Sequence, residues 1–182
     1  MNPKLISAGA LLATLLIGTS VQAATFSFTT GLNAANEFVP GSSPATGTAT
    51  LTFDDVAKSV TVFEQWQGLT SAITINHVHC CTAVAGAGNS PTVIDFAPGT
   101  ATAGSYSATF VAGATLNFTL AEFAPLLAGT QAGQAYVNLH TDNNKGGEIR
   151  GFLAPVPEPE TYALMALGLG VVGFWTRRRS AR

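Results

Sequence analysis

Charged residues are scarce in this chain: only 10% of its 182 residues are Asp, Glu, Lys or Arg, against about 25% in typical soluble domains. Together with a hydrophobic fraction of 47%, this excludes a disordered polyelectrolyte. Five of the eight basic residues lie at the two ends, whereas residues 24–157 hold three basic residues against eight acidic ones. A mildly acidic middle excludes a basic nucleic-acid-binding protein, and we expect no nucleic-acid partner.

Residues that commonly carry chemistry are also few, with three histidines and two cysteines. The sequence has no Gly-x-Ser-x-Gly nucleophile motif and no glycine-rich phosphate-binding loop with its lysine. Its acidic residues are scattered singly and form no pair with a recognisable catalytic spacing. We therefore predict no catalytic residues and favour a non-enzymatic protein.

The first 23 residues have the pattern of a secretory signal peptide. Lys4 supplies the positive start, an apolar stretch follows at 5–17, and Val21-Gln22-Ala23 fits the small-x-small rule. We expect signal peptidase to cut between Ala23 and Ala24 and the mature protein to leave the cytoplasm. The alternative is a retained membrane anchor, for which the apolar stretch is short against the ~20 residues of a membrane span.

The C-terminus has three parts in a fixed order: a linker rich in Pro and Glu at 155–161, an apolar run at 162–176, and a basic tail at 177–182. The run is marginal for the ~20 residues that a bilayer requires, but flanking arginine side chains can reach back to the interface. We predict a transmembrane helix at 162–176, with a cytoplasmic basic tail because arginines favour that side.

With Pro157, Glu158 and Pro159 directly before the span, this tail resembles the PEP-CTERM sorting signal of Gram-negative bacteria that make extracellular polysaccharide. The resemblance implies recognition by an exosortase, a membrane cysteine transpeptidase, and cleavage near these three residues. The protein would pass through the inner membrane and then be released or attached at the cell surface. A simple C-terminal membrane anchor is the alternative.

The segment 24–154 between the end signals alternates in the manner of half-buried strands. In Thr48–Phe53, for example, Ala49, Leu51 and Phe53 alternate with threonines. The other runs that we expect to be strands are Thr25–Thr29, Ser59–Gln65, Ala72–His79, Thr92–Ala97, Ser105–Val111, Thr115–Leu120, Ala135–Thr141 and Glu148–Leu153.

About nine short strands between Gly-, Pro- and Asn-rich turns predict an all-β domain, an antiparallel Greek-key-type β-sandwich. One or two helical turns are expected at Leu120–Ala128, where Ala and Leu cluster before Gly129. The outward faces of the strands are rich in Thr, Ser and Asn rather than in charge. Such a surface suits an extracellular matrix protein, with polysaccharide as a candidate partner.

All three histidines lie in this segment. His77 and His79 are two residues apart at the end of an expected strand, so they share one face of it. His140 ends another expected strand, and three imidazoles converge if the two strands are neighbours. Three nitrogens suit zinc or copper. The alternative is that His77 and His79 are tucked at the edge of the core beside Ile73 and Ile75, with His140 exposed.

The two cysteines, Cys80 and Cys81, are adjacent. Outside the cytoplasm an even cysteine count usually indicates disulfides. The options are a disulfide between the two neighbours, intermolecular bridges, or thiols that join the histidines on copper or zinc. We favour a purely structural role.

The stretch 142–148, rich in Asn and Gly, follows His140 and predicts a tight turn with positive φ angles. Beyond it, Glu148 and Arg150 share a strand face, and we favour an ordinary surface ion pair worth under about 1 kcal/mol. The functional alternative is that the turn orders His140 while Arg150 holds a carboxylate or an anionic ligand.

Three strings carry a second resemblance: Ala72–His79 with its His-x-His end, Ala135–Thr141 with Tyr-Val-Asn-Leu-His-Thr, and Gly146–Leu153 with Gly-Gly-Glu-Ile-Arg-Gly. They resemble the CHRD domain, first described in chordin, over roughly Ala24–Ala154. The resemblance implies an extracellular β-sandwich module of unestablished biochemical role. The motif positions carried over are His77, His79, His140, Thr141, Gly146, Gly147, Glu148, Arg150 and Gly151.

The His-x-His strand with a later His and Arg is also similar to the copper side of Cu/Zn superoxide dismutases, which share the sandwich architecture. This chain has no fourth histidine to bridge two metals, so dismutase activity is not the leading prediction. We expect an exported, non-enzymatic β-sandwich module at the cell surface or in the matrix. The alternatives are a copper- or zinc-binding protein with a dismutase-like site at His77, His79 and His140, and a polysaccharide-binding matrix protein.

Overall fold

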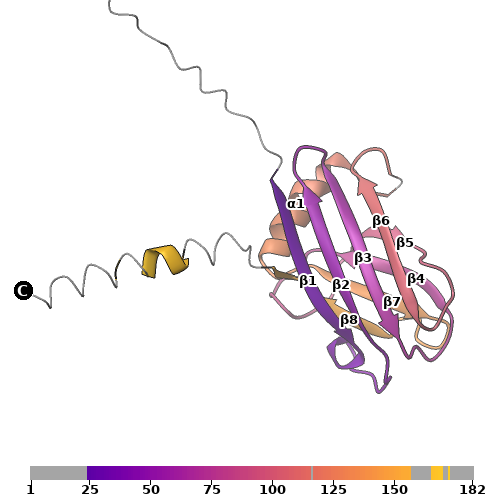
Figure 1. Cartoon of the computed structure of the whole chain (residues 1–182). Helices are drawn as coiled ribbons and strands as arrows, with labels where there is room; N and C mark the ends of the chain where they lie inside the picture. Colours follow the sequence, from indigo (N-terminus) through magenta and orange to yellow (C-terminus); the bar gives the residue numbers. More distant parts are fainter. Residues whose placement is uncertain (1–23, 116, 157–164, 170–171, 173–182) are drawn as a thin grey trace, which may run out of the picture.

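The computed structural model describes residues 24–115, 117–156, 165–169 and 172. Its folded part is mostly antiparallel β-structure, as Figure 1 shows. The strands are β1 (Thr25–Asn33), β2 (Thr46–Asp54), β3 (Ser59–Gln67), β4 (Ile73–His79), β5 (Thr92–Phe96), β6 (Gly104–Val111), β7 (Tyr136–Thr141), β8 (Ile149–Phe152) and β9 (Ala154–Pro155). The helical elements among them are the 3₁₀ turn η1 (Ala34–Asn36) and helix α1 (Leu120–Gln131). The all-β prediction is confirmed.

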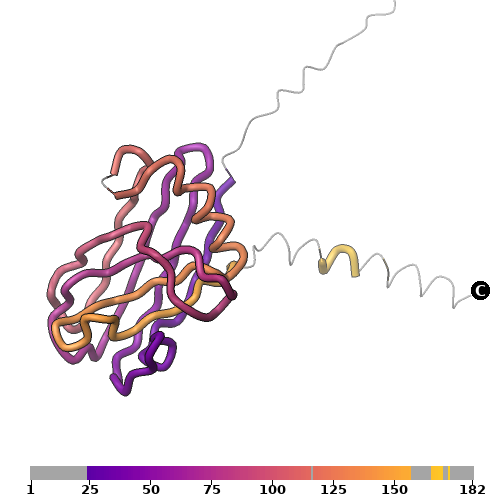
Figure 2. The backbone as a smooth tube through the Cα atoms, turned by 180° about the vertical axis from the view of Figure 1, so that it is seen from behind, coloured from indigo at the N-terminus to yellow at the C-terminus, as the bar shows by residue number. Residues whose placement is uncertain are grey.

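One hydrogen-bonded sheet, in the order β5-β4-β7-β8-β1-β2-β3-β6 with β9 paired to β1, curls on itself into two layers. Strands β1, β2, β3 and β6 form the layer nearest the viewer in Figure 1, and β4, β7 and β8 cross behind it. Figure 2 shows the second layer and its loops from the opposite side. The chain passes between the layers from β3 to β4, from β5 to β6 and from β6 to β7.

The hydrophobic core lies between the layers because each strand turns alternate residues inward. Side chains with 0% exposure come from both layers, among them Leu51, Phe53 and Val62 from the first and Val78, Val137 and Leu139 from the second. Every buried apolar residue of the described chain lies between Phe28 and Leu153. The core formed by the described residues therefore lies wholly within residues 24–156, called the domain below, as is expected of a segment that folds on its own.

The prediction of a strand at Thr115–Leu120 is wrong. Asn117 has a positive φ of 67°, which a regular strand does not allow. Thr119 then caps the start of α1. Its backbone N–H and its hydroxyl donate to the Glu122 carboxylate at 2.7 and 2.8 Å, an arrangement typical of the first turn of a helix. The helix also runs past the expected end at Ala128, as far as Gln131.

The end signals fall mostly outside the described residues. This holds for the predicted signal peptide at 1–23, the sorting motif at 157–159 and the basic tail at 177–182. Within the predicted span at 162–176, residues 165–169 are helical. Among the helices of the described residues, none has the length and hydropathy needed to cross a bilayer.

Candidate metal centre

The three histidines gather on the outer face of the second layer. In β4, Asn76 and Val78 turn into the core, so His77 and His79 point the other way. Strand β7 pairs antiparallel with β4, which sets His140 opposite Ile75 and beside the His-x-His pair. The ring centroids of His77 and His140 are 4.6 Å apart, and those of His77 and His79 are 5.2 Å apart. The two strands are therefore neighbours, as the convergence of the three imidazoles requires.

One ring nitrogen from each histidine faces a common point, and the three nitrogens lie within 4.8 Å of one another. The nitrogens His77 Nδ1, His79 Nε2 and His140 Nε2 are buried and have no hydrogen-bond partner among the described residues. His140 is 8% exposed and His77 and His79 are half-buried. The alternative of an exposed His140 is therefore wrong.

The second nitrogen of each ring is held by an acceptor. The Nδ1 of His79 lies 2.9 Å from the Ser90 carbonyl oxygen, and the Nδ1 of His140 lies 2.9 Å from that of Lys145. The Nε2 of His77 lies 3.2 Å from Oδ1 of Asp95. An acceptor at one nitrogen assigns the proton to it and leaves the lone pair on the other. The lone pairs consequently lie on the three buried, unpartnered nitrogens, an arrangement that a cation would stabilise.

The surroundings favour neutral imidazoles. The pKa of His77 is lowered to about 4, chiefly by burial and also by the neighbouring His140 and His79, against the opposing effect of Asp95. Burial also lowers the pKa of His79 and of His140, although their hydrogen bonds to Ser90 and Lys145 oppose the shift. Neutral imidazole is the form that binds a metal ion.

Tyr136 supports His79 in two ways. The two rings are stacked, with centroids 4.6 Å apart and planes 9° from parallel. The Tyr136 hydroxyl also accepts a hydrogen bond at 3.3 Å from the backbone N–H of Ser90, whose carbonyl holds the His79 ring. The guanidinium of Arg150 lies 4.8 Å from the centre of the Tyr136 ring. His79 therefore has a fixed ring plane as well as a fixed tautomer.

Glu148 and Arg150 form no surface pair, so that expectation is wrong. Both are buried, at 2% and 3% exposure. The Arg150 guanidinium donates to the carbonyl oxygens of Asn36 and Gly88 and, at 2.9 Å, to Oδ1 of Asn89. It is thus used to tie loops to β8. None of the hydrogen bonds or ion pairs found for it among the described residues is to a carboxylate.

Glu148 anchors the turn that follows His140. Its carboxylate accepts hydrogen bonds from Ser43 Oγ at 2.6 Å, Thr141 Oγ1 at 2.6 Å and the Thr70 N–H at 2.8 Å. Burial raises the pKa of Glu148, but these hydrogen bonds more than offset the effect and keep the pKa below its ordinary value. With the His140–Lys145 bond, the geometry agrees with the functional alternative that the turn orders His140.

Of the two adjacent glycines in this turn, Gly147 is the one whose position requires a glycine. Gly147 has a φ of +123°, and a Cβ there would lie 2.5–2.6 Å from the amide of Asn138 and 2.7 Å from Oε2 of Glu37. A larger residue would collide with both. Burial raises the pKa of Glu37 to about 7, against the effects of Arg150 and Asn138. Around Gly146 nothing lies within 4 Å of a Cβ, and Gly151 lies against the Gly31 carbonyl and the Thr30 side chain.

The cysteines are not part of the histidine cluster. A disulfide joins Cys80 to Cys81, and both sulfurs face the carbonyl of Pro125 on α1. The bonded sulfurs are therefore not thiolate ligands in this structure.

Sequence patterns alone did not single out Asp95, Ser90 or Tyr136 as parts of the site. Asp95 carries a usable sequence signal, because it is an acid within the otherwise apolar Val93–Phe96 run. The structure places it opposite His77 in the sheet. Ser90 contributes only backbone atoms to the site, which leave no mark in a sequence. Tyr136 is recognisable only once β4 and β7 are known to pair.

Two models of known protein families match the chain. The family model described as the CHRD domain matches residues 28–153, and the model described as the PEP-CTERM protein-sorting motif matches residues 155–180. No curated protein matches the chain in sequence.

Proposed function

Because the chain belongs to the CHRD domain family and ends in a PEP-CTERM sorting signal that indicates export to the cell surface or beyond, we propose that it is an exported protein whose β-sandwich binds one transition-metal ion through His77, His79 and His140. The observation that carries the proposal is the set of three converging, unpartnered ring nitrogens. The proposed role is binding and not catalysis.

The ligand set restricts the class of metal. Imidazole is a common ligand of zinc and copper, whereas magnesium and calcium prefer oxygen. The Asp95 carboxylate beside His77 and the hydrogen bonds of His79 to Ser90 and of His140 to Lys145 supply the outer support that metal-binding histidines commonly have. A site for a second metal of the dismutase type has no imidazole left to build it, because the chain contains three histidines.

The test is metal retention by the purified domain (residues 24–156). After chelator treatment it is exposed to Cu(II) or Zn(II), desalted and analysed for metal and protein content. We expect about one ion per chain for one of these metals at a three-histidine site. His79→Ala and His140→Ala should each abolish retention, while Asp142→Ala, an exposed acid on the turn after His140, should retain the metal. Wild-type domain without metal, or histidine variants that retain it, would contradict the proposal.

Processing by signal peptidase at Ala23/Ala24 and by exosortase at Pro157–Pro159 completes the proposed route. Replacing Pro157, Glu158 and Pro159 by alanine should block maturation and leave the precursor in the inner membrane. Unchanged cleavage and unchanged location of the variant would contradict the sorting step without bearing on the metal site.

A further inference from the structure

The first layer presents an outer face that the metal proposal does not use. Strands β1, β2, β3 and β6 turn their core residues toward the second layer, and no element of the described chain covers their other side (Figure 1). This surface is called the hydroxyl face below. Its residues include Ser27, Thr29, Thr46, Thr48, Thr50, Thr52, Thr61, Phe63, Gln65, Gln67, Ser105, Ser107 and Thr109, with Val111 at the end of β6.

Strand register arranges the hydroxyls in rows across the sheet. One row runs through Ser27, Thr52, Thr61 and Thr109. Within it the Ser27 and Thr52 hydroxyls are 3.3 Å apart and those of Thr61 and Thr109 are 2.8 Å apart. Each bond uses only part of the hydrogen-bonding capacity of a hydroxyl, which can donate once and accept twice. The rows therefore keep donors and acceptors free for a ligand.

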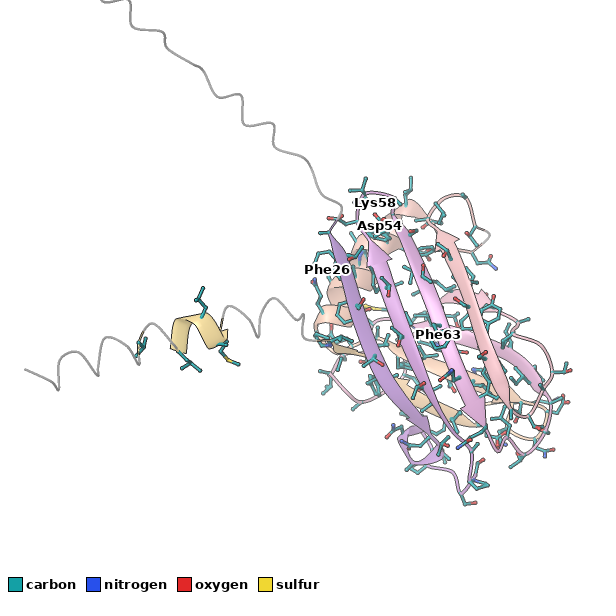
Figure 3. All side chains as sticks on the ribbon, in the orientation of Figure 1. Phe26, Asp54, Lys58 and Phe63 are labelled. Carbon is teal, nitrogen blue, oxygen red and sulfur yellow. A yellow bond between two sulfur atoms is a disulfide. The ribbon has the colours of Figure 1, made fainter. Side chains whose placement is uncertain are left out.

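An aromatic ring and a groove interrupt these rows. Phe63 lies in the middle of the face (Figure 3) and is 38% exposed. Toward the end of β3 a shallow groove of about 410 Å³ is lined by Thr46, Gly47, Thr48, Gln65, Trp66 and Gln67. Amide side chains there can each donate and accept, so the face combines an apolar ring with two-way hydrogen bonding.

Charge is confined to one end of the hydroxyl face. The four strands contain two acidic residues, Asp54 and Glu64, and no Lys, Arg or His. Glu64 is in the core at 0% exposure, and Asp54 lies with Lys58 at the turn between β2 and β3 (Figure 3). A charged polymer would lose hydration on this face without gaining an ion pair. A second copy of the chain is also a poor fit, because stable dimer interfaces need a more apolar centre than the single ring of Phe63, with Val111 at the edge of the face.

We propose that the hydroxyl face binds a neutral polysaccharide. Sugar hydroxyls are both donors and acceptors and match the Thr, Ser and Gln side chains, while the apolar C–H face of a sugar ring matches the ring of Phe63. The four paired strands offer a site about 15–20 Å across, from a strand spacing of about 4.8 Å, so several sugar rings can be in contact at once. This site shares no residue with the metal centre.

The test is mobility of the domain in native gels that contain a dissolved polysaccharide. The neutral probes are dextran, hydroxyethylcellulose and galactomannan, and the charged probe is alginate. We expect retardation by at least one neutral polymer and none by alginate. Phe63→Ala and Gln65→Ala should each weaken the affinity about ten-fold, as removal of a central contact does, whereas Gln131→Ala, an exposed glutamine at the end of α1, should leave it unchanged.

Three results would overturn the proposal: no retardation by any of the three neutral polymers, equal retardation by alginate, or wild-type retardation of both face variants. Light scattering on the same samples can give a fourth result that would overturn it. A dimer that Phe63→Lys converts to monomer would assign the face to a second copy of the chain. Circular dichroism of each variant shows whether a loss of binding is a loss of fold.

Discussion

At the scale of single residues, the metal proposal depends on how firmly the rings are held. His79 has the most support, because Tyr136 stacks on its ring and also holds Ser90, whose carbonyl fixes its tautomer. Mutation of a residue that holds a metal-binding histidine in place typically lowers metal affinity by about 10- to 100-fold. Tyr136 is thus a positioning residue, not a ligand.

We predict that Tyr136→Leu weakens metal affinity by about ten-fold or more, because both supports are lost. Tyr136→Phe keeps the stacked ring and should cost less. Competition with a chromophoric chelator measures both affinities. Phe152→Leu, which removes an aromatic contact of Tyr136 without touching a histidine, is the control; equal affinity of Tyr136→Leu and wild type would refute the role.

Glu64 is the other residue with an uncommon environment. It has 0% exposure and accepts a short hydrogen bond from the amide of Asn76, which is equally buried and belongs to the opposite layer. Burial raises the pKa of Glu64 to about 8, although the bond from Asn76 opposes this. The folded state therefore keeps the carboxyl protonated at a pH where the unfolded chain has released the proton.

The consequence for stability has a definite sign. A raised folded-state pKa contributes stability that is complete below about pH 4.5 and is lost as the pH rises toward about 8. Glu64→Gln removes this titration. As the pH rises through this window, the free energy of unfolding of wild type should therefore fall relative to that of the variant, by up to about 1.4 kcal/mol per pH unit. Urea unfolding at pH 5 and pH 7.5 measures the difference; a gap independent of pH would show that Glu64 titrates normally.

At the scale of elements, α1 and the end of β4 meet at the disulfide. A Cβ on Gly129 would overlap the sulfurs of both Cys80 and Cys81, so a residue without a side chain is required at this point of the helix. The sequence places Gly129 after an expected helix end, but the helix continues through it to Gln131. The glycine is used for close packing and not for ending the helix.

We predict that Gly129→Ala destabilises the domain by about 1–3 kcal/mol, the cost of overpacking a core. The gain in helix propensity, below about 1 kcal/mol, does not offset it. In a Cys80→Ala/Cys81→Ala background the same substitution should cost clearly less, because the sulfurs are gone. Urea unfolding of the four proteins completes the cycle, and an equal cost in both backgrounds would locate the strain elsewhere.

Most strands could be predicted from alternation, because apolar residues that face the core alternate with residues that face outward, which in the first layer are mostly Thr and Ser. The same signal failed at Thr115–Leu120. There Phe118 is buried although it belongs to no strand, and Thr119 and Glu122 cap the start of a helix. For the site, the His-x-His spacing predicts a shared face. The convergence of His140 could not be predicted, because it depends on the pairing of β4 with β7, a contact distant in sequence.

At the scale of the whole molecule, the two proposed sites lie on opposite outer faces of the sandwich. The metal centre is on the β4–β7 layer, and the hydroxyl face is on the layer of β1, β2, β3 and β6. The packed core between them contains residues with 0% exposure from both layers. Nothing shared by the two sites would couple them.

We therefore predict independent binding. His140→Ala should lose the metal and keep wild-type retardation by neutral polysaccharide, and Phe63→Ala should show the reverse. The two assays described above, run on both variants, measure this directly. Loss of both activities in one folded variant would show that the sites are coupled.

Whether the three imidazoles form one metal site can be seen by anomalous diffraction from crystals of the domain grown with Cu(II) or Zn(II). We expect one strong peak, with His77 Nδ1, His79 Nε2 and His140 Nε2 each about 2.0–2.1 Å from it. A peak elsewhere on the domain, or none at this cluster in metal-loaded crystals, would contradict it.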